Sequence, residues 1–171
     1  SSDVCSSDLD GVLFNEESDI IKHGNTYSGA VPVKYGEDPE STGDGSQIDW
    51  IVYRYADVLT LLSEAIVRQG NSVTQEAVDL LNQIRVRAKL SPYTMGDIKG
   101  VDYFLDKMLQ ERGHEFWWEG NRRADLIRHG KFIQNAIDRG STTTKPEFVL
   151  FPLPQAVINE GKGIIIQNPG Y

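Results

Sequence analysis

Apolar residues recur at helical spacing through the middle of the chain and predict two neighbouring helices. Over residues 55 to 70 they form one stripe, made of Val58, Leu61, Leu62, Ala65 and Ile66. The next helix carries a second stripe, made of Val73, Ala77, Leu80, Leu81, Ile84 and Ala88. We expect Gly70 to end the first helix in a left-handed conformation, and Ser72 with Gln75 to form a capping box for the second. The short connection makes the helices antiparallel, so the two stripes should face each other.

Further helices are predicted in the C-terminal half. They are, in order, a helix over residues 101–119, a short charged helix over 121–129, a turn or two over 131–139 and a last turn over 155–160. Three prolines make residues 145–154 (KPEFVLFPLP) extended, and we expect Phe151 and Leu153 to pack against helices. An alternative is that Pro-x-Pro binds a partner as a polyproline ligand. The chain is predicted to be all-α with an extended C-terminal strap.

The N-terminal part lacks sustained periodicity. Residues 1–10 (SSDVCSSDLD) repeat Ser-Ser-Asp and predict neither helix nor strand, so we interpret them as a non-native or disordered junction. Residues 11–48 are rich in Gly, Ser, Asp and Asn and are expected to be a loop-rich segment, most polar from Lys34 to Gln47. Residues 49–171 form the predicted helical region.

Charge and composition exclude several classes of protein. The 171 residues carry a formal net charge of −8, which argues against binding to nucleic acid because phosphates require a basic surface. The single cysteine excludes a cysteine-based zinc site, and the three histidines, His23, His114 and His129, are scattered. We expect neither a metal nor a cofactor.

Acidic and arginine residues are concentrated between residues 111 and 128. Glu111, Glu115 and Glu119 are four residues apart and would share one face of a helix. Two such carboxylates could act as the general acid and base of a glycosidase. Arginines in the same stretch nearly equal the carboxylates, and neighbouring guanidinium groups lower a carboxylate pKa, whereas a general acid needs a raised one. We favour an ion-pair network that braces neighbouring helices.

Exposed aromatic rings could bind sugars by stacking on their C–H faces. The candidates are Trp50, Tyr53, Tyr55, Tyr93, Tyr103, Trp117 and Trp118. Trp117 and Trp118 cannot both face the core of one helix, so one of them should be partly exposed or pack against the strap, although we favour core packing for each. Trp50 stands at the edge of the polar loop and is the better candidate for an exposed platform.

Four stretches of the helical region resemble the SusD/RagB family. They are RYADVLTLLSEA (residues 54–65), LNQIRVRAKL (81–90), ERGHEFWWEGNRRADLIRHGK (111–131), and FPLPQAVINEG together with the closing QNPGY. The resemblance runs from Trp50 to Tyr171. At Lys89 the sequence departs from the family, which usually has glycine there, and we expect this lysine to lie on a helix surface.

The resemblance implies a fold and a role. The fold is all-α with a tetratricopeptide-like helical hairpin, and the role is that of a non-enzymatic lipoprotein on the outer-membrane surface of Bacteroidota. Such proteins bind glycans or other nutrients and act with a SusC-like TonB-dependent transporter. The lipid anchor is expected in an N-terminal part absent from this chain. Residues that match the family motifs are assigned to the fold, namely Arg54, Tyr55, Asp57, Glu115, Glu119, Gly120, Arg122, Asp125 and Arg128.

We therefore predict non-covalent capture of an oligosaccharide or polysaccharide for uptake, with Trp50 and the Lys34–Gln47 loop at the edge that meets ligand or transporter. A helical-repeat module that binds a protein partner and no small ligand is an alternative. A glycoside hydrolase fragment that uses Glu115 and Glu119 is a further one.

Overall fold

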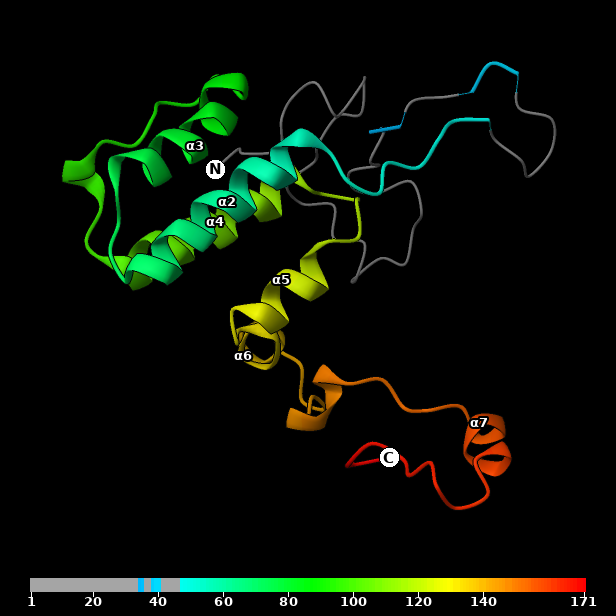
Figure 1. Ribbon diagram of the computed structural model, residues 1–171. Helices are drawn as coiled ribbons and strands as arrows, with labels where there is room; N and C mark the ends of the chain where they lie inside the picture. The colour runs from blue at the N-terminus through cyan, green and yellow to red at the C-terminus, as the bar shows by residue number, and fades with distance from the viewer. Residues whose placement is uncertain (1–33, 36–37, 41–46) are drawn as a thin grey trace. The chain divides into compact units, whose positions relative to one another are not determined.

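The computed structural model describes residues 34–35, 38–40 and 47–171, and they contain helices but no strands (Figure 1). The predictions for residues 1–10, His23 and most of residues 11–48 lie outside this part. The chain divides into a first unit that ends at Gly120 and a second unit from Asn121 to Tyr171. The first contains α2 (Tyr55–Gly70), α3 (Gln75–Arg87), a 3-10 turn (Met95–Asp97) and α4 (Val101–Glu115). The second contains α5 (Arg122–Arg128), α6 (Phe132–Asp138), a 3-10 turn (Pro146–Val149) and α7 (Gln155–Glu160). The all-α prediction is confirmed.

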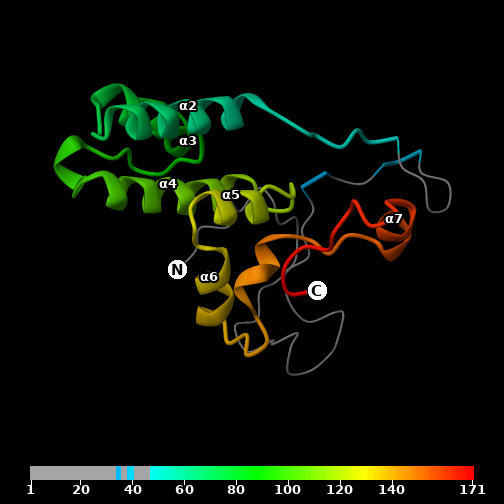
Figure 2. The same ribbon diagram turned by 60° about the horizontal axis from the view of Figure 1, so that its bottom comes forward.

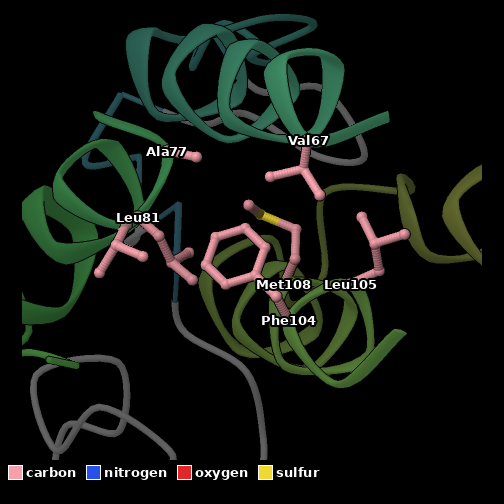
Figure 3. Packing of buried hydrophobic residues seen from close by; sticks show 7 residues of the cluster. Val67, Ala77, Leu81, Phe104, Leu105 and Met108 are labelled. Atoms are coloured by element: carbon pink, nitrogen blue, oxygen red, sulfur yellow. The ribbon is translucent and has the colours of Figure 1, made fainter. Parts of the chain in front are cut away.

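The core of the first unit lies between α2, α3 and α4. Figure 3 shows Val67 of α2 pointing toward Met108 and Phe104 of α4, with Ala77 and Leu81 of α3 beside them. A second cluster, nearer the start of α2, consists of Ala56, Leu59, Ile84 and Phe116. The two clusters make α2 and α3 an antiparallel hairpin that packs on α4 (Figure 2).

The predicted apolar stripe of α2 does not face α3, which corrects the sequence-based assignment. Val58, Leu61, Leu62 and Ala65 are exposed, and only Ile66 packs against the core. The buried side of α2 consists of Ala56, Asp57, Leu59, Thr60, Ser63, Glu64 and Val67. Polar groups on this side are paired: the Ser63 hydroxyl, for example, donates to the carbonyl of Ala77 at 2.6 Å. Hydropathy alone cannot find a buried face whose polar groups have partners.

The connection between α2 and α3 also differs in detail from the prediction. The left-handed residue is Asn71, with φ +43°, because Gly70 is still helical. The cap of α3 is Thr74, whose side chain accepts from the backbone N–H of Ala77 at 3.2 Å, in place of Ser72.

Lys89 adopts a left-handed backbone conformation at the end of α3, with φ +59°. The N–H of Leu90 donates to Arg85 O at 2.8 Å and that of Lys89 to Val86 O at 3.0 Å, which is the Schellman pattern of helix ends. The expectation that Lys89 simply occupies a helix surface is therefore wrong. Gly130 has the equivalent position after α5, with φ +66°, and shows why glycine suits it.

The second unit is organised around Arg123. Its Nη2 donates to the carbonyl oxygens of Phe148 at 3.2 Å and Val149 at 3.0 Å. Its guanidinium lies 4.0 Å from the centre of the Phe151 ring, which is otherwise exposed, so the prediction that Phe151 is packed against helices is wrong. Residues 146–149 form a 3-10 turn within the predicted strap, because proline is tolerated at the first position of a helix. Among the described residues, no helix is both long and apolar enough to span a membrane.

Candidate functional site

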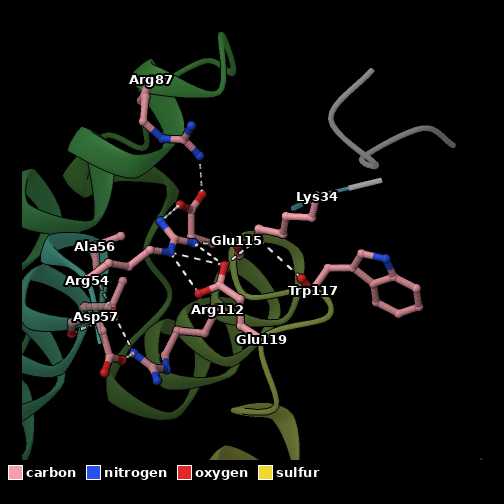
Figure 4. Close-up of polar contacts among 10 residues, drawn as sticks. Lys34, Arg54, Ala56, Asp57, Arg87, Arg112, Glu115, Trp117 and Glu119 are labelled. Atoms are coloured by element: carbon pink, nitrogen blue, oxygen red, sulfur yellow. Dashed lines mark hydrogen bonds and ion pairs between the residues drawn. The ribbon is translucent and has the colours of Figure 1, made fainter. Parts of the chain in front are cut away.

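An ion-pair network joins the start of α2 to the end of α4 (Figure 4). Arg54, the residue before α2, pairs with Glu115 through Nη1, and its Nε lies 2.9 Å from Glu119 Oε2. Arg87 from the end of α3 donates to the other oxygen of Glu115 at 2.6 Å. Lys34 pairs with Glu119. We call these five residues, Lys34, Arg54, Arg87, Glu115 and Glu119, the ionic cluster.

The ionic cluster also explains where α4 ends, which is four residues earlier than predicted. The carbonyl oxygen of Glu115 accepts from Arg54 Nη2 at 2.6 Å and from Lys34 Nζ at 2.8 Å. In a continuing helix this oxygen would accept from the N–H of Glu119, which donates instead to Phe116 O at 3.1 Å. Trp118 and Gly120 take left-handed conformations, with φ of +66° and +84°. The resulting turn brings Glu119 to Arg54 without a further helical turn.

A second charged group lies deeper, where Arg112 of α4 meets α2. Arg112 Nη1 lies 2.6 Å from Asp57 Oδ1 and donates to the hydroxyl of Thr60. The side chains of Arg112 and Asp57 are only 3% and 7% exposed. Phe116 lies between two guanidinium groups, with ring-centre distances of 4.7 Å to Arg112 and 4.5 Å to Arg54. The pair is thus shielded from water, and removing one of its charges should be costly.

A third group joins α3 to α4. Arg85 pairs with Glu111, and the hydroxyl of Tyr93 donates to the same carboxylate at 2.9 Å. Burial, followed by this hydrogen bond, raises the pKa of Tyr93 to about 12. Glu111 therefore lies in a different group from Glu115 and Glu119, although the three were predicted to share one helical face.

The electrostatics of the cluster argue against acid–base catalysis. Burial raises the pKa of Glu119, but hydrogen bonds from Arg54 and Lys34 outweigh this effect and hold the pKa below its ordinary value. Burial lowers the pKa of Arg54, and its bonds to Glu119 and Glu115 reverse this and raise it. A general acid needs a carboxylic acid that keeps its proton near neutral pH. The pKa of Glu119 is lowered instead, so this residue gives up its proton more readily than an ordinary glutamate.

Exposed aromatic rings surround the ionic cluster. Trp50 stacks on Tyr35 with the ring centres 4.7 Å apart, and Lys34 precedes Tyr35 in the chain. Lys34 Nζ also donates to the carbonyl oxygen of Trp117 at 3.3 Å. Trp117 and Trp118 are more than half exposed, with ring centres 6.3 Å apart, so the expectation that they pack in the core is wrong. We call Trp50, Tyr53, Trp117 and Trp118 the aromatic surface, and all four are more than half exposed.

The other residues assigned to the family motifs lie elsewhere. Asp125 and Arg128 pair within α5 at 2.8 Å, in the second unit. The ring of Tyr55 is exposed at the start of α2. Burial lowers the pKa of Arg122. The described residues contain no group of His, Cys, Asp and Glu side chains suited to a metal ion.

These features define an all-α protein whose clustered carboxylates are paired with cations and whose exposed rings are suited to binding. The model of the SusD family matches residues 11–171, so the chain belongs to the SusD family. This agrees with the resemblance given by the four motifs and with the prediction that the chain is not an enzyme. Residues 1–10 fall outside the match.

Individual relatives extend the comparison. The starch-binding protein SusD of Bacteroides thetaiotaomicron is 27% identical over 165 residues, which cover 92% of this chain and 27% of that protein. SusD-like protein P38 of Formosa agariphila is 38% identical over 90 residues, covering 49% of this chain and 18% of the relative. The chain thus spans about a quarter or less of these two relatives.

Comparison with solved structures also finds proteins of this kind. A SusD homologue from Bacteroides thetaiotaomicron superposes with a TM-score of 0.64 at 26% identity, over 90% of this chain and 31% of that one. Surface glycan-binding protein A from the same organism, in complex with laminarihexaose, superposes with a TM-score of 0.56 at 25% identity, over 87% and 34%.

Proposed function

We propose that this chain is part of a cell-surface glycan-binding protein and that the aromatic surface contacts the sugar. The observation that carries the proposal is the pair of exposed tryptophans, Trp117 and Trp118, held on a turn by the ionic cluster. A tryptophan with positive φ is an uncommon and costly conformation, and such outliers concentrate at functional sites. The starch-binding relative and the relative in complex with laminarihexaose support a glycan as the ligand class.

The chemistry of the surface suits a neutral sugar. Indole faces stack on the apolar C–H face of a pyranose ring, and nearby charged groups can donate to its hydroxyls. The Arg87 side chain is 61% exposed and offers donors beyond its bond to Glu115. The cluster fixes the backbone of the turn through its carbonyl oxygens, and a fixed backbone lowers the entropic cost of binding.

We further propose that the captured glycan passes to a SusC-like TonB-dependent transporter at the outer membrane, and that Trp50 stands near the ligand or transporter edge. A cap over a transporter holds its ligand at high effective concentration, so modest affinity for the glycan suffices. In this role the protein cleaves no bond, and Glu115 and Glu119 serve only to hold the turn.

Retention of the purified protein in native gels containing starch or laminarin tests the proposal. We expect Trp117→Ala and Trp118→Ala each to weaken retention by about 5-fold or more, which corresponds to roughly 1 kcal/mol of lost stacking. Trp50→Ala tests the predicted platform in the same way. Phe151→Ala is the matched control, because this exposed ring belongs to the second unit and should leave retention unchanged.

Three results would contradict the proposal. Unchanged retention in all three tryptophan variants would remove the aromatic surface from the site. Release of reducing ends from the glycan by wild-type protein, abolished by Glu119→Gln, would favour the hydrolase. Capture of a protein partner with no glycan retention would favour the protein-interaction module.

A further inference from the structure

The ionic cluster keeps its carboxylates buried and its cations accessible. The side chains of Glu115 and Glu119 are only 4% and 3% exposed. The cationic side chains are 17% exposed for Lys34, 25% for Arg54 and 61% for Arg87. Three cations against two carboxylates leave a surplus of one positive charge, and the part of the cluster that reaches solvent is the positive part. A ligand that approaches the cluster therefore meets cationic groups.

Arg87 keeps N–H donors that no described residue uses. Lys34 Nζ already contacts three acceptors, and Arg54 donates through Nε, Nη1 and Nη2. Within the described part of the chain Arg87 donates through Nη2 alone, to Glu115 Oε2 at 2.6 Å. A guanidinium carries five N–H donors in a planar fork, so most of them are left for a ligand. The bond to Glu115 holds the fork in place.

Arg87 and the exposed tryptophans border the same cluster. Arg87 binds the side chain of Glu115, and Lys34 Nζ joins the carbonyl oxygen of Glu115 to that of Trp117, at 2.8 and 3.3 Å. Figure 4 shows the side chains of Arg87 and Trp117 on different sides of the cluster. Contacts with the two side chains therefore suit different units of one glycan.

We infer that the ligand is an acidic glycan, whose carboxylate or sulfate group pairs with Arg87 while its rings stack on the aromatic surface. This inference rests on the proposed function and adds the charge of the ligand to it. A guanidinium binds an oxyanion through parallel N–H donors, and such charge-assisted bonds are stronger than neutral ones. A pyranose ring offers its C–H face to a tryptophan whether or not the glycan is charged, so the stacking contacts stay as proposed above.

The charge of the whole chain makes such binding selective. With a formal net charge of −8, the chain repels polyanions in general. An acidic glycan is bound only where a local cation outweighs that repulsion, as the exposed guanidinium of Arg87 can. A nucleic acid fits less well, because its phosphates need several cations with free donors in a row.

Matched ligands test the charge of the glycan. Polygalacturonate carries a carboxylate on each sugar, and its methyl ester has the same backbone without the charge. In affinity gels at low ionic strength we expect the purified protein to bind polygalacturonate about 5-fold more tightly than the ester, as for one partly exposed ion pair. The preference should disappear in about 1 M salt, which screens such pairs. Carrageenan and its desulfated form give the same comparison for sulfate, and show which of the two anions is bound.

Two arginine variants separate a local contact from a change in net charge. Arg87→Gln should bring the ratio of the two affinities to about 1, whereas Arg87→Lys should keep part of the preference because the charge remains. A purely structural role of Arg87 would weaken both ligands alike and leave the ratio unchanged. Arg68→Gln is the matched control and should keep the wild-type ratio. Arg68 is also a partly exposed arginine, at 43%, and pairs with a buried carboxylate, Glu64, at 2.7 Å, but it lies in the last turn of α2, whereas the cluster meets the start of that helix.

Equal binding of the charged and uncharged glycans by the wild-type protein would overturn the inference. A preference that survives Arg87→Gln, or that is lost in Arg68→Gln as well, would also overturn it. Retention of starch or laminarin without retention of either acidic glycan would overturn this inference and leave the proposed function intact. Unchanged retention in the tryptophan variants would contradict the proposed function instead, and retention of no glycan at all would contradict both.

Discussion

The buried pair of Asp57 and Arg112 should be one of the costliest places to remove a charge. Arg112 Nη1 lies 2.6 Å from Asp57 Oδ1, and both side chains are more than nine-tenths buried. Asp57→Ala removes the carboxylate that Arg112 pairs with on α2. Breaking a buried pair in this way costs about 3–5 kcal/mol. Since a domain of ordinary stability has only about 5–15 kcal/mol, the variant should lose a large share of its free energy of unfolding.

The loss in free energy of unfolding should be smaller when both charges are removed together. The double variant Asp57→Ala with Arg112→Met removes both members of the pair, and methionine keeps much of the arginine stem volume. Replacing a buried ion pair by apolar residues is often nearly neutral. Arg112 also donates to Thr60 and lies 4.7 Å from the Phe116 ring centre, and these contacts are lost. We therefore expect the double variant to be within about 1–2 kcal/mol of the wild type.

Urea unfolding followed by far-ultraviolet circular dichroism measures both effects. Asp79→Ala is the matched control, because this helical carboxylate is exposed and, within the described part of the chain, accepts from Gln75 alone, at 2.8 Å. We expect its removal to cost less than about 0.5 kcal/mol. A cost for Asp57→Ala below about 1 kcal/mol would refute the reasoning, because the pair would then behave like a solvent-exposed one. A double variant as unstable as the worse single variant would show that packing, rather than charge, sets the cost.

Three other predictions concern helix ends, pH and the core. Lys89 and Gly130 both have a left-handed backbone conformation, which glycine adopts without strain. In urea unfolding, Lys89→Gly should therefore stabilise the chain by about 0.5–1 kcal/mol, and Gly130→Lys should destabilise it by about 1 kcal/mol. Variants as stable as the wild type would contradict this. The pKa of Glu119 is lowered in the folded state, so its stabilising effect is complete above the ordinary glutamate pKa and is lost as pH falls through the lowered one. Glu119→Gln should therefore flatten the acid limb of a plot of stability against pH, and an unchanged limb would remove Glu119 as a source. Phe104→Ala should cost about 3–5 kcal/mol because Phe104 is fully buried, whereas the exposed control Val86→Ala should cost less than about 0.5 kcal/mol.

The positions of the helices were largely readable from local sequence signals. The predicted helix over residues 55–70 and the last turn over 155–160 coincide with α2 and α7. Gly130 ends α5 as its position suggests. These features depend on spacing and on the conformational freedom of glycine, both of which act over a few residues.

Ion pairs and hydrogen bonds between residues far apart in the sequence explain the features that could not be predicted. The end of α4 depends on Arg54 and Lys34, which are 61 and 81 residues away from Glu115 and take the carbonyl that the helix would otherwise use. The exposure of Trp117 and Trp118 follows from the same turn. The arginine and glutamate content did predict ion pairing, but the cations that pair with Glu111, Glu115 and Glu119 lie outside that stretch of sequence. They are Lys34, Arg54, Arg85 and Arg87. Spacing within one helix cannot identify partners on another.

The orientation of α2 shows why its apolar stripe was assigned to the wrong side of the helix. An apolar stripe is assigned to the core because water disfavours its exposure, and that reasoning holds only when the helix has one neighbouring layer. Here Asp57, Thr60 and Ser63 find partners on α3 and α4, so the inner side of α2 is satisfied without the stripe. Val58 and Leu62 stay exposed in this chain, so the free energy that their burial would provide is not gained. The buried side of α2 combines these paired polar residues with Ala56, Leu59 and Val67, and a stripe chosen by hydropathy alone therefore falls on the other side of the helix.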